Sequence, residues 1–531
     1  MPSAASDSEN EETAKTVQRE GDAANARSGD FSRRSVMIGG ALVGGSAYAE
    51  RLPGVATAAA REQGRTIDAI ALRNKIKGEI ATPDDADFNR LAFDGLWNQL
   101  HASDRLPQII VRVQDEQDVC EAVRFARRNG LKVVVRGGGH NWCCPSLRRG
   151  GLLIDLGSLD KIISIDAGSR RATLQPIISN RELQRRLNAV GLSYPSGHCP
   201  QVKLSGYLLS GGMAWNQGVW GPGVAGVEAV DVVTAEGDLI TASKNQNADY
   251  FWAARGAGYG FFGVAVRYHL KLYPLPKHIA ASSYFYSLDK VGGVADWLAN
   301  IAGKLPANVE LSLFLLTAPS ELADRCKAQS GKVSLMTATV FADSQEEARN
   351  ATSLLEQCPI IGECLSKTVN EHVDFDRLFD MSGAMWPENR RNQVEAMFSN
   401  SNPKGLFEAL KAHFMNAPSP ESLVLYAFST GQNATAPADA AFAMRAPLYG
   451  GLWTIWRNAR DDDTNLNWHK KYLEILKPFA ANYYIGETDS VSYPDHVRRA
   501  FATRADFQRI EELRKKHDPT GVFYNYFDGL R

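Results

Sequence analysis

The sequence predicts an α+β protein in which a mixed strand–helix block is followed by a domain built on an antiparallel sheet. Up to about residue 276, short apolar strands alternate with amphipathic helices, whereas residues 277–490 carry alternating strand-like runs with helices between them. The composition is that of a globular protein, with 44% hydrophobic and 22% charged residues. A chain of 531 residues is long enough for two or three domains.

The first 49 residues are expected to lie outside the fold. Residues 1–30 are polar and nearly free of large apolar side chains, which is typical of a disordered tail. Arg33 and Arg34 then precede an apolar run, residues 36–49, that is too short to span a bilayer and ends in a small-x-small cleavage pattern. This resembles a twin-arginine (Tat) export signal. We therefore expect a periplasmic or extracellular protein with no membrane anchor in the mature chain; a disordered tail with a chance arginine pair is the alternative.

Charge and cysteine usage exclude several classes of function. The formal net charge is −1, so the whole chain gives no electrostatic case for binding nucleic acid. Seven cysteines are an odd number, which excludes a complete set of intramolecular disulfides. The sequence has no C-x-x-C pair and no zinc-like His/Cys spacing, and Asp461–Asp463 is expected to be a solvated loop. We predict no metal.

Local signals define the strands and helices of the first block. Asp115 is placed to cap a helix that Gly130 ends, and Asn180 to cap a helix whose apolar face includes Val190. Residues 226–243 are expected to form a hairpin around Glu236-Gly237-Asp238, and a long strand ends at the prolines before residue 277. Further strands are expected at residues 109–113, 132–136, 152–156 and 172–175.

Alternating apolar runs identify the strands of the second domain. Residues 281–288, 309–318 and 334–342 are expected to be antiparallel strands, and residues 345–356 an amphipathic helix between such strands. A last helix, capped near Asp506, leads through a turn into a short aromatic tail.

The stretch "VVVRGGGHNWCC" carries the first functional signal. A predicted strand ends in Arg136, followed by three glycines and His140. Glycines let the backbone approach a ligand closely, and their successive N–H groups can form an anion nest to which Arg136 adds charge. The stretch is neither a Walker loop nor G-x-G-x-x-G. Alone it fits a tight turn equally well.

Two further patches make the signal specific. They are "YPSGHCPQVKLSGYLLSGGMAWNQGVWGPG" and "NADYFWAARGAGYGFFGVAVRYHLKLYPLP". With "LPQIIVRVQDEQDVCEAVRFARRNGLKVVVRGGGHN" they resemble the PCMH-type FAD-binding domain of the vanillyl-alcohol-oxidase superfamily. The "GHCP…SGG" patch and "KKHDPTGVFYNYF" resemble its berberine-bridge-enzyme-like branch. The resemblance implies a two-part FAD-binding domain over residues 50–276, an α/β substrate domain over 277–490, and a segment over 491–531 that returns to the FAD domain.

The resemblance also implies how the flavin is held. His140 matches the histidine that bonds to the flavin 8α-methyl, and Cys199 matches the cysteine that bonds to carbon 6. Both attachments need a good nucleophile, and two tethers should raise the reduction potential of the ring. The alternatives are purely structural roles, with His140 as a turn histidine and Cys199 as a buried thiol. The rest of the implied cofactor-binding set is Arg136, Gly137, Gly138, Gly139, Asn141, Gly211, Gly212, Gly263, Val264 and Asn525.

Some positions depart from the family pattern or stay open. Ser210 stands where many relatives have glycine and Trp220 where many have tyrosine, so access of substrate or oxygen can differ. Cys143 and Cys144 are expected to be packed and inert rather than a vicinal disulfide. His198 either polarises the Cys199 thiol or is a loop histidine.

The catalytic base is expected in "NYYIGETDS". The resemblance implies Glu487 at the family's catalytic Tyr/Glu position and Tyr484 at the first tyrosine of the segment, and both are expected to be catalytic. Gly486 stands in place of the usual asparagine, and Asp489 matches the last aspartate. A carboxylate whose pKa is raised by burial can take a proton from a substrate hydroxyl or amine. The alternative for Glu487 is a charged rim residue.

We therefore expect an FAD enzyme that oxidises an alcohol, sugar or amine carbon by hydride transfer to flavin N5, with O2 as acceptor. Its partners are a small-molecule substrate and O2. A flavin dehydrogenase with another electron acceptor, an oxidative cyclase acting on an aromatic natural product, and a non-catalytic flavin-binding module are the alternatives. The sequence does not fix the substrate or the oligomeric state.

Overall fold

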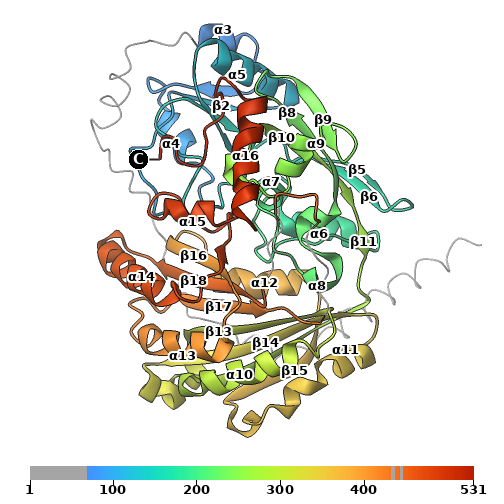
Figure 1. Ribbon diagram of the computed structural model, residues 1–531, viewed down its shortest axis with the longest axis vertical. Helices are drawn as coiled ribbons and strands as arrows, with labels where there is room; N and C mark the ends of the chain where they lie inside the picture. Colours follow the sequence, from blue (N-terminus) through green and yellow to red (C-terminus); the bar gives the residue numbers. More distant parts are fainter. Residues whose placement is uncertain (1–68, 432–436, 443–445, 531) are drawn as a thin grey trace, which may run out of the picture. The chain divides into compact units, whose positions relative to one another are not determined.

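A computed structural model describes residues 69–431, 437–442 and 446–530. Apart from 319–321, these residues belong to one compact unit (Figure 1). The predicted tail and Tat signal lie outside the described residues. The structure confirms the predicted α+β class, because its helices accompany three main sheets.

The first sheet is mainly parallel and largely buried. Its order is β1-β2-β4-β3, with β2, β4 and β3 parallel and β1 antiparallel at the edge. The central strands are short runs of valine, isoleucine and leucine, as expected for strands covered on both faces. The strands are β1 (Glu79–Ala81), β2 (Ile109–Arg112), β3 (Val133–Arg136) and β4 (Leu152–Asp155), and the helices beside them are α3 (Ile70–Arg73), α4 (Phe88–Phe93) and α5 (Glu116–Arg128).

The second sheet is antiparallel and has the order β5-β6-β10-β8-β9. The predicted hairpin is confirmed as β8 and β9, and the predicted long strand as β10. Its strands are β5 (Ile162–Asp166), β6 (Arg171–Leu174), β8 (Val227–Val233), β9 (Leu239–Ser243) and β10 (Val264–Lys271). A separate pair joins β7 (Leu192–Ser193) to β11 (Tyr273–Pro274), and the helices of this region are α6 (Asn180–Asn188), α7 (Leu204–Leu209), α8 (Gln217–Trp220) and α9 (Ala248–Ala253).

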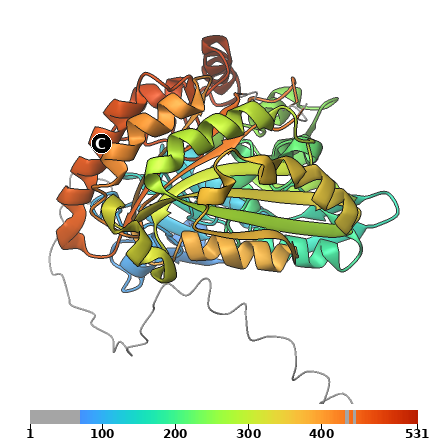
Figure 2. The same cartoon turned by 90° about the horizontal axis from the view of Figure 1, so that it is seen from below.

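The third sheet has eight antiparallel strands in the order β15-β12-β14-β13-β17-β18-β16-β19. Helices α10, α13 and α14 cover one face of it, and α12 lies on the other face, where it packs against α6 (Figures 1 and 2). The strands are β12 (His278–Ser287), β13 (Val309–Thr317), β14 (Lys332–Ala342), β15 (Ser366–Val373), β16 (Arg391–Ser399), β17 (Leu423–Phe428), β18 (Leu448–Trp456) and β19 (Asn482–Tyr483). The helices are α10 (Val291–Ala302), α11 (Gln345–Thr352), α12 (Phe375–Met385), α13 (Pro403–Phe414) and α14 (Asp462–Leu476).

The C-terminal segment returns to the edge of the first sheet. After α15 (Pro494–Arg498) and α16 (Arg504–His517), the Asp518 carboxylate accepts hydrogen bonds from the Val522 and Phe523 N–H groups. Val133 of β3 then donates its N–H to the Val522 carbonyl, and its own carbonyl accepts from Tyr524. The aromatic tail is thereby paired to the strand that leads into the glycines. The predicted domain boundaries themselves stay predictions.

Two predicted helix caps are wrong by a few residues. Helix α6 is capped by the Ser179 hydroxyl rather than by Asn180, because the extended backbone at Ser179 lets its Oγ accept the Glu182 N–H. That helix ends at Asn188, and Val190 is exposed. Helix α16 is capped by Thr503, whose hydroxyl accepts the N–H of Asp506, while the Asp506 side chain accepts the Thr503 N–H in return.

Candidate active site

A cavity of about 1120 Å³ is lined by residues of the first and third sheets and of the loop that precedes β10 of the second. Its walls come from the loop after β3, the segment from Gly197 to α7, the turn before β10, and strands β13, β14, β16, β17 and β18 of the large sheet. Most small-molecule pockets have volumes of roughly 300–1,000 Å³. The cavity therefore has room for a dinucleotide-sized cofactor together with a small substrate.

The three glycines after β3 turn the chain along the cavity wall. Gly139 has a left-handed φ of +66°, and a Cβ at this position would collide with the carbonyl oxygen of Gly95. A Cβ on Gly138 would collide with the side chain of Lys203. Tight packing thus requires glycine here, and the turn that results delivers His140 to the cavity.

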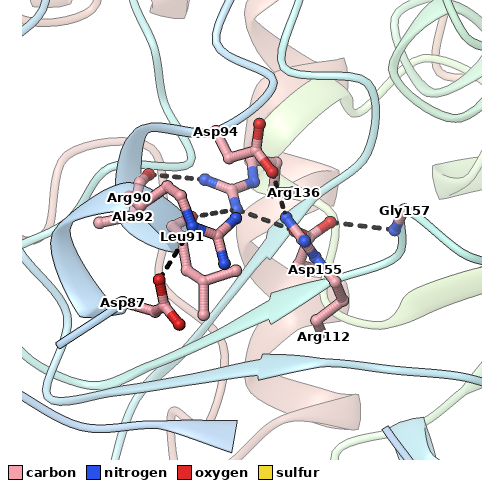
Figure 3. Close-up of polar contacts among 9 residues, drawn as sticks. All are labelled: Asp87, Arg90, Leu91, Ala92, Asp94, Arg112, Arg136, Asp155 and Gly157. Atoms are coloured by element: carbon pink, nitrogen blue, oxygen red, sulfur yellow. Dashed lines mark hydrogen bonds and ion pairs between the residues drawn. The ribbon is translucent and has the colours of Figure 1, made fainter. Parts of the chain in front are cut away.

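The Arg136 guanidinium is committed to a buried network (Figure 3). Its side chain is 2% exposed and donates to the carbonyls of Leu91 and Ala92, each at 2.6 Å, and to Asp155 at 2.9 Å. Asp155 also accepts from Arg112 at 3.1 Å. Arg136 lines the cavity, but these bonds hold its charged end in the protein. Any contact that it makes with a cofactor must therefore come from its backbone.

Replacing Asp155 with asparagine should destabilise the fold. The change leaves the buried Arg136 charge uncompensated, which typically costs about 3–5 kcal/mol. Urea unfolding followed by tryptophan fluorescence measures the loss. The matched control is Asp104→Asn, which removes an exposed partner of Arg149 and should cost no more than about 1 kcal/mol. Equal losses for the two variants would contradict this account of the network.

His140 lies at the cavity wall beside two tryptophans. Its ring centroid is 4.7 Å from that of Trp97 and 5.9 Å from that of Trp142. Burial lowers the pKa of His140 to about 4. The imidazole is therefore neutral at pH 7, and one ring nitrogen keeps a free lone pair.

Cys199 lines the same cavity and is held by its backbone. The Asn180 side-chain amide in the first turn of α6 donates to the Cys199 carbonyl at 3.0 Å. Burial, with a smaller contribution from the nearby Glu487 carboxylate, raises the pKa of the thiol to about 12. The resting group is thus a neutral thiol, and the structure brings both predicted attachment residues to one cavity.

Glu487 and Tyr484 follow β19 and face the cavity with Tyr449 of β18. The Tyr449 hydroxyl donates to Glu487 Oε2 at 2.6 Å. Burial raises the pKa of Glu487 to about 7, and this hydrogen bond opposes part of the rise. Burial and Glu487 together raise the pKa of Tyr484, so its phenol keeps its proton at neutral pH. The carboxylate is the group here that can accept a proton near neutrality.

Of the other predicted cofactor residues, Asn141 and Gly263 line the cavity, whereas Val264 and Asn525 do not. The Asn141 side chain donates to the Gly486 carbonyl at 3.0 Å, which ties the glycine loop to the segment that carries Glu487. Gly263 lines the cavity, whereas Val264, the next residue, is buried in β10. The Asn525 amide oxygen accepts from the N–H groups of Phe527 and Asp528 and so fixes the C-terminal turn.

Gly211 and Gly212 form the turn after α7. Both have positive φ values, 107° and 79°. The N–H of Gly212 acts on the Tyr484 phenol and opposes part of the rise in its pKa. This turn therefore packs against the predicted catalytic segment.

Comparisons with known proteins agree with this geometry. Residues 107–243 match the family described as FAD binding domain. The FAD-linked oxidoreductase nodO of Hypoxylon pulicicidum is 26% identical over 78% of this chain and 90% of its own length. The (R)-6-hydroxynicotine oxidase of Paenarthrobacter nicotinovorans is 31% identical over 46% of this chain and 53% of its own. The structure of Physcomitrella patens BBE-like 1 has a TM-score of 0.73 at 19% identity, and covers 88% of this chain and 100% of that one.

The chain is an FAD-linked oxidoreductase. It has the berberine-bridge-like fold, and its residues 107–243 match an FAD-binding domain, as the sequence motifs predict. The residues of this FAD-linked oxidoreductase fit the cofactor. The cavity has the volume for it, the glycine loop brings bare backbone to the wall, and a neutral imidazole and a thiol face the same space.

The remaining chemically active side chains have other roles. Cys143 and Cys144 are separate thiols, and burial raises the pKa of each to about 12, so both are protonated. His198 does not donate to Cys199 in the described structure; its Nε2 lies 3.3 Å from Glu310 Oε2. Within the described ranges, no cluster of His, Cys, Asp or Glu fits a metal, and no helix has the length and apolarity to cross a bilayer.

Sequence reasoning missed three residues of this site: Tyr449, Lys203 and Glu310. Tyr449 lies 38 residues before the carboxylate to which it donates. Lys203 precedes α7 and lines the cavity beside the glycines. Glu310 lies in an alternating run that predicted a strand, and the burial pattern of that run has it pointing opposite to its apolar neighbours Val309 and Leu311. A charged residue on one face of such a strand was the available signal for Glu310.

Proposed function

We propose that this oxidoreductase carries FAD attached to both His140 and Cys199 and oxidises an alcohol, sugar or amine carbon of a small molecule, with O2 as the acceptor. The observation that carries the proposal is the convergence of His140, Cys199 and Glu487 on one cavity. When bound, the flavin accepts a hydride from the substrate carbon. The relative from Paenarthrobacter is named an oxidase, which supports O2 as acceptor.

His140 and Cys199 are suited to different attachments. The neutral imidazole of His140 offers a lone pair without first losing a proton. The Cys199 thiol must lose its proton before it can act as a nucleophile. Glu487 lines the same cavity, and its charge adds to the rise in the pKa of that thiol.

Glu487 is the proposed catalytic base. Its carboxylate faces the cavity, and the Tyr449 hydroxyl fixes Oε2, which leaves Oε1 to meet a substrate hydroxyl or amine proton. A base works best when its pKa lies near the working pH, and burial gives Glu487 such a pKa. Tyr484 packs beside this pair, with its ring centroid 5.7 Å from that of Tyr449, and helps to exclude water.

The test of the proposal starts with colour. The purified protein should be yellow, and acid precipitation should leave the colour in the pellet. A panel of sugars, benzylic alcohols and cyclic amines should include compounds that bleach the flavin without oxygen and release H2O2 in air. A colourless protein, or a flavin that acid releases into the supernatant, would refute the attachment. Bleaching followed by reoxidation only with an artificial dye would refute O2 as the acceptor.

The rate of flavin reduction should depend on the ionisation of Glu487. Only the carboxylate form can accept a proton, and the pKa of Glu487 is about 7. The rate should therefore be low below pH 6, rise through about pH 7, and level off above pH 8. Stopped-flow bleaching between pH 5 and 9 measures this profile. A rate that is flat across this range would count against the assignment.

We also propose that the chain is exported through its twin-arginine segment, residues 1–49. The support is the sequence pattern alone, because these residues lie outside the described structure. Transport of folded proteins by this route suits an enzyme that acquires its cofactor before it leaves the cytoplasm.

A further inference from the structure

We propose that the cavity wall formed by the large sheet binds an organic cation, so that the substrate is a hydrophobic amine held as its ammonium ion, with Glu310 as the anchoring carboxylate. This inference rests on the proposed function and narrows it. It concerns the part of the cavity lined by β13, β14, β16, β17, β18 and the segment with Glu487.

Charged side chains are segregated along the cavity. Lys203 lies on the side of the glycine loop and α7, where a cofactor bearing phosphates would need positive charge. On the wall from the large sheet, the described lining residues include two carboxylates, Glu310 and Glu487, and no lysine or arginine. A negatively charged substrate would be repelled there. A positively charged one would be attracted.

Glu310 is held in place with its charge available. It lies on β13 with a side chain that is 21% exposed, at the cavity surface. Oε1 accepts the backbone N–H of Asn216 at 2.5 Å, and Oε2 lies 3.3 Å from His198 Nε2. The Asn216 N–H is neutral, and a carboxylate has about four lone-pair positions. Glu310 therefore keeps acceptor capacity for a ligand, and His198 is steadied by Trp215, whose ring centroid is 4.0 Å away.

The same wall offers aromatic faces and sulfur. Aromatic rings attract ammonium groups through their negative faces, and methionine adapts to apolar surfaces of irregular shape. Neutral hydroxyl and amide groups, such as Ser312 and Asn400, add hydrogen-bonding capacity without adding positive charge. The aromatic and methionine side chains on this wall, on and just after α12, and on the segment with Glu487 are Phe314, Met381, Met385, Trp386, Phe398, Tyr449, Trp453 and Tyr484.

The two carboxylates have different roles, with Glu310 binding the ammonium ion and Glu487 accepting its proton. An ammonium ion must lose its N–H proton before the adjacent carbon can give up a hydride, because the nitrogen lone pair has to become available. Glu487 is the proposed acceptor of that proton, while Glu310 holds the ligand in place. The two electrons leave with the hydride, as in the proposed function, and O2 is the final oxidant.

The test measures binding of a cation that cannot be turned over. The probe is benzyltrimethylammonium, and its neutral control is neopentylbenzene, in which carbon replaces the nitrogen. Quenching of tryptophan fluorescence in the purified holoenzyme reports binding, because Trp142, Trp215, Trp386 and Trp453 line the cavity. We expect the cation to bind at least about tenfold more tightly than its neutral isostere.

Two variants test whether Glu310 causes the preference for the cation. Glu310→Gln should abolish most of the preference for the cation and leave the affinity for neopentylbenzene unchanged, which also shows that the cavity is intact. Glu371→Gln, an exposed carboxylate on β15 outside the cavity, should leave both affinities as in the wild type. Equal wild-type affinities for the two probes would overturn the proposal, as would full cation affinity in Glu310→Gln. The wild-type ratio decides the matter even where the variant fails to fold.

The experiments distinguish an error in the amine proposal from an error in the proposed function. Equal binding of the two probes by a yellow protein that bleaches with a neutral alcohol or a sugar would refute the amine and keep the oxidoreductase. A protein without attached flavin would refute the proposed attachment whatever the probes show.

Discussion

Replacing Glu487 with glutamine should slow bleaching of the flavin by substrate by a factor of about 10²–10⁴, the usual contribution of a positioned general base. Glutamine keeps the size of the side chain and can still meet the Tyr449 hydroxyl, but it cannot accept a proton at neutral pH. Anaerobic stopped-flow measurements at saturating substrate isolate this step from the reaction with oxygen. The variant should also lose the rise in rate through about pH 7.

Tyr449→Phe is the matched companion of this variant. The phenol donates to Glu487 Oε2 and lowers the pKa of the carboxyl from the value that burial alone would give. Removing the hydroxyl should therefore move the midpoint of the pH–rate profile to a higher pH. The maximal rate should stay measurable. A Glu487→Gln protein that bleaches as fast as wild type would show that the base lies elsewhere. An unmoved profile in Tyr449→Phe would show that the phenol does not tune it.

The second large effect is expected from removing both attachment residues. His140→Ala and Cys199→Ala should each leave one covalent link, so acid precipitates of the single variants stay yellow. The double variant should release all of its flavin into the acid supernatant or purify without colour. The physical reason is that non-covalent contacts are lost on denaturation, whereas the proposed bonds to imidazole and thiol persist.

Cys144→Ala provides the control for these variants. Cys144 is 1% exposed and lies four residues after His140, and burial keeps its thiol protonated. Its removal should leave the flavin attached. A double variant whose precipitate remains fully yellow would place the attachment at other residues.

The strands and helices were predictable where the signal is local. The valine and isoleucine runs of β2, β3 and β4, and the hairpin of β8 and β9, follow from composition and turn residues within a few positions. Cap positions were less certain, because Ser179 and Asn180 are both good capping residues. The extended backbone at Ser179, which decides between them, is seen only in the structure.

The site was predictable only in part, because its contacts are long-range. Family motifs identified His140, Cys199 and Glu487, and the structure brings them to one cavity. No motif marks Tyr449, since its partner lies on a different element. The charge of Arg136 suggested that its side chain binds a cofactor phosphate. Arg136 instead pairs in register with Asp155, because the two residues end the neighbouring strands β3 and β4. Only the pairing of the two strands shows that the charge is already neutralised.

The most direct test of the central claim is the mass of the peptides that contain His140 and Cys199. Denatured holoenzyme, digested with a protease, should yield one branched species in which the two peptides are joined through a single FAD. Its absorbance should be that of a flavin. Recovery of both peptides at their unmodified masses, from protein that was yellow before denaturation, would contradict the account.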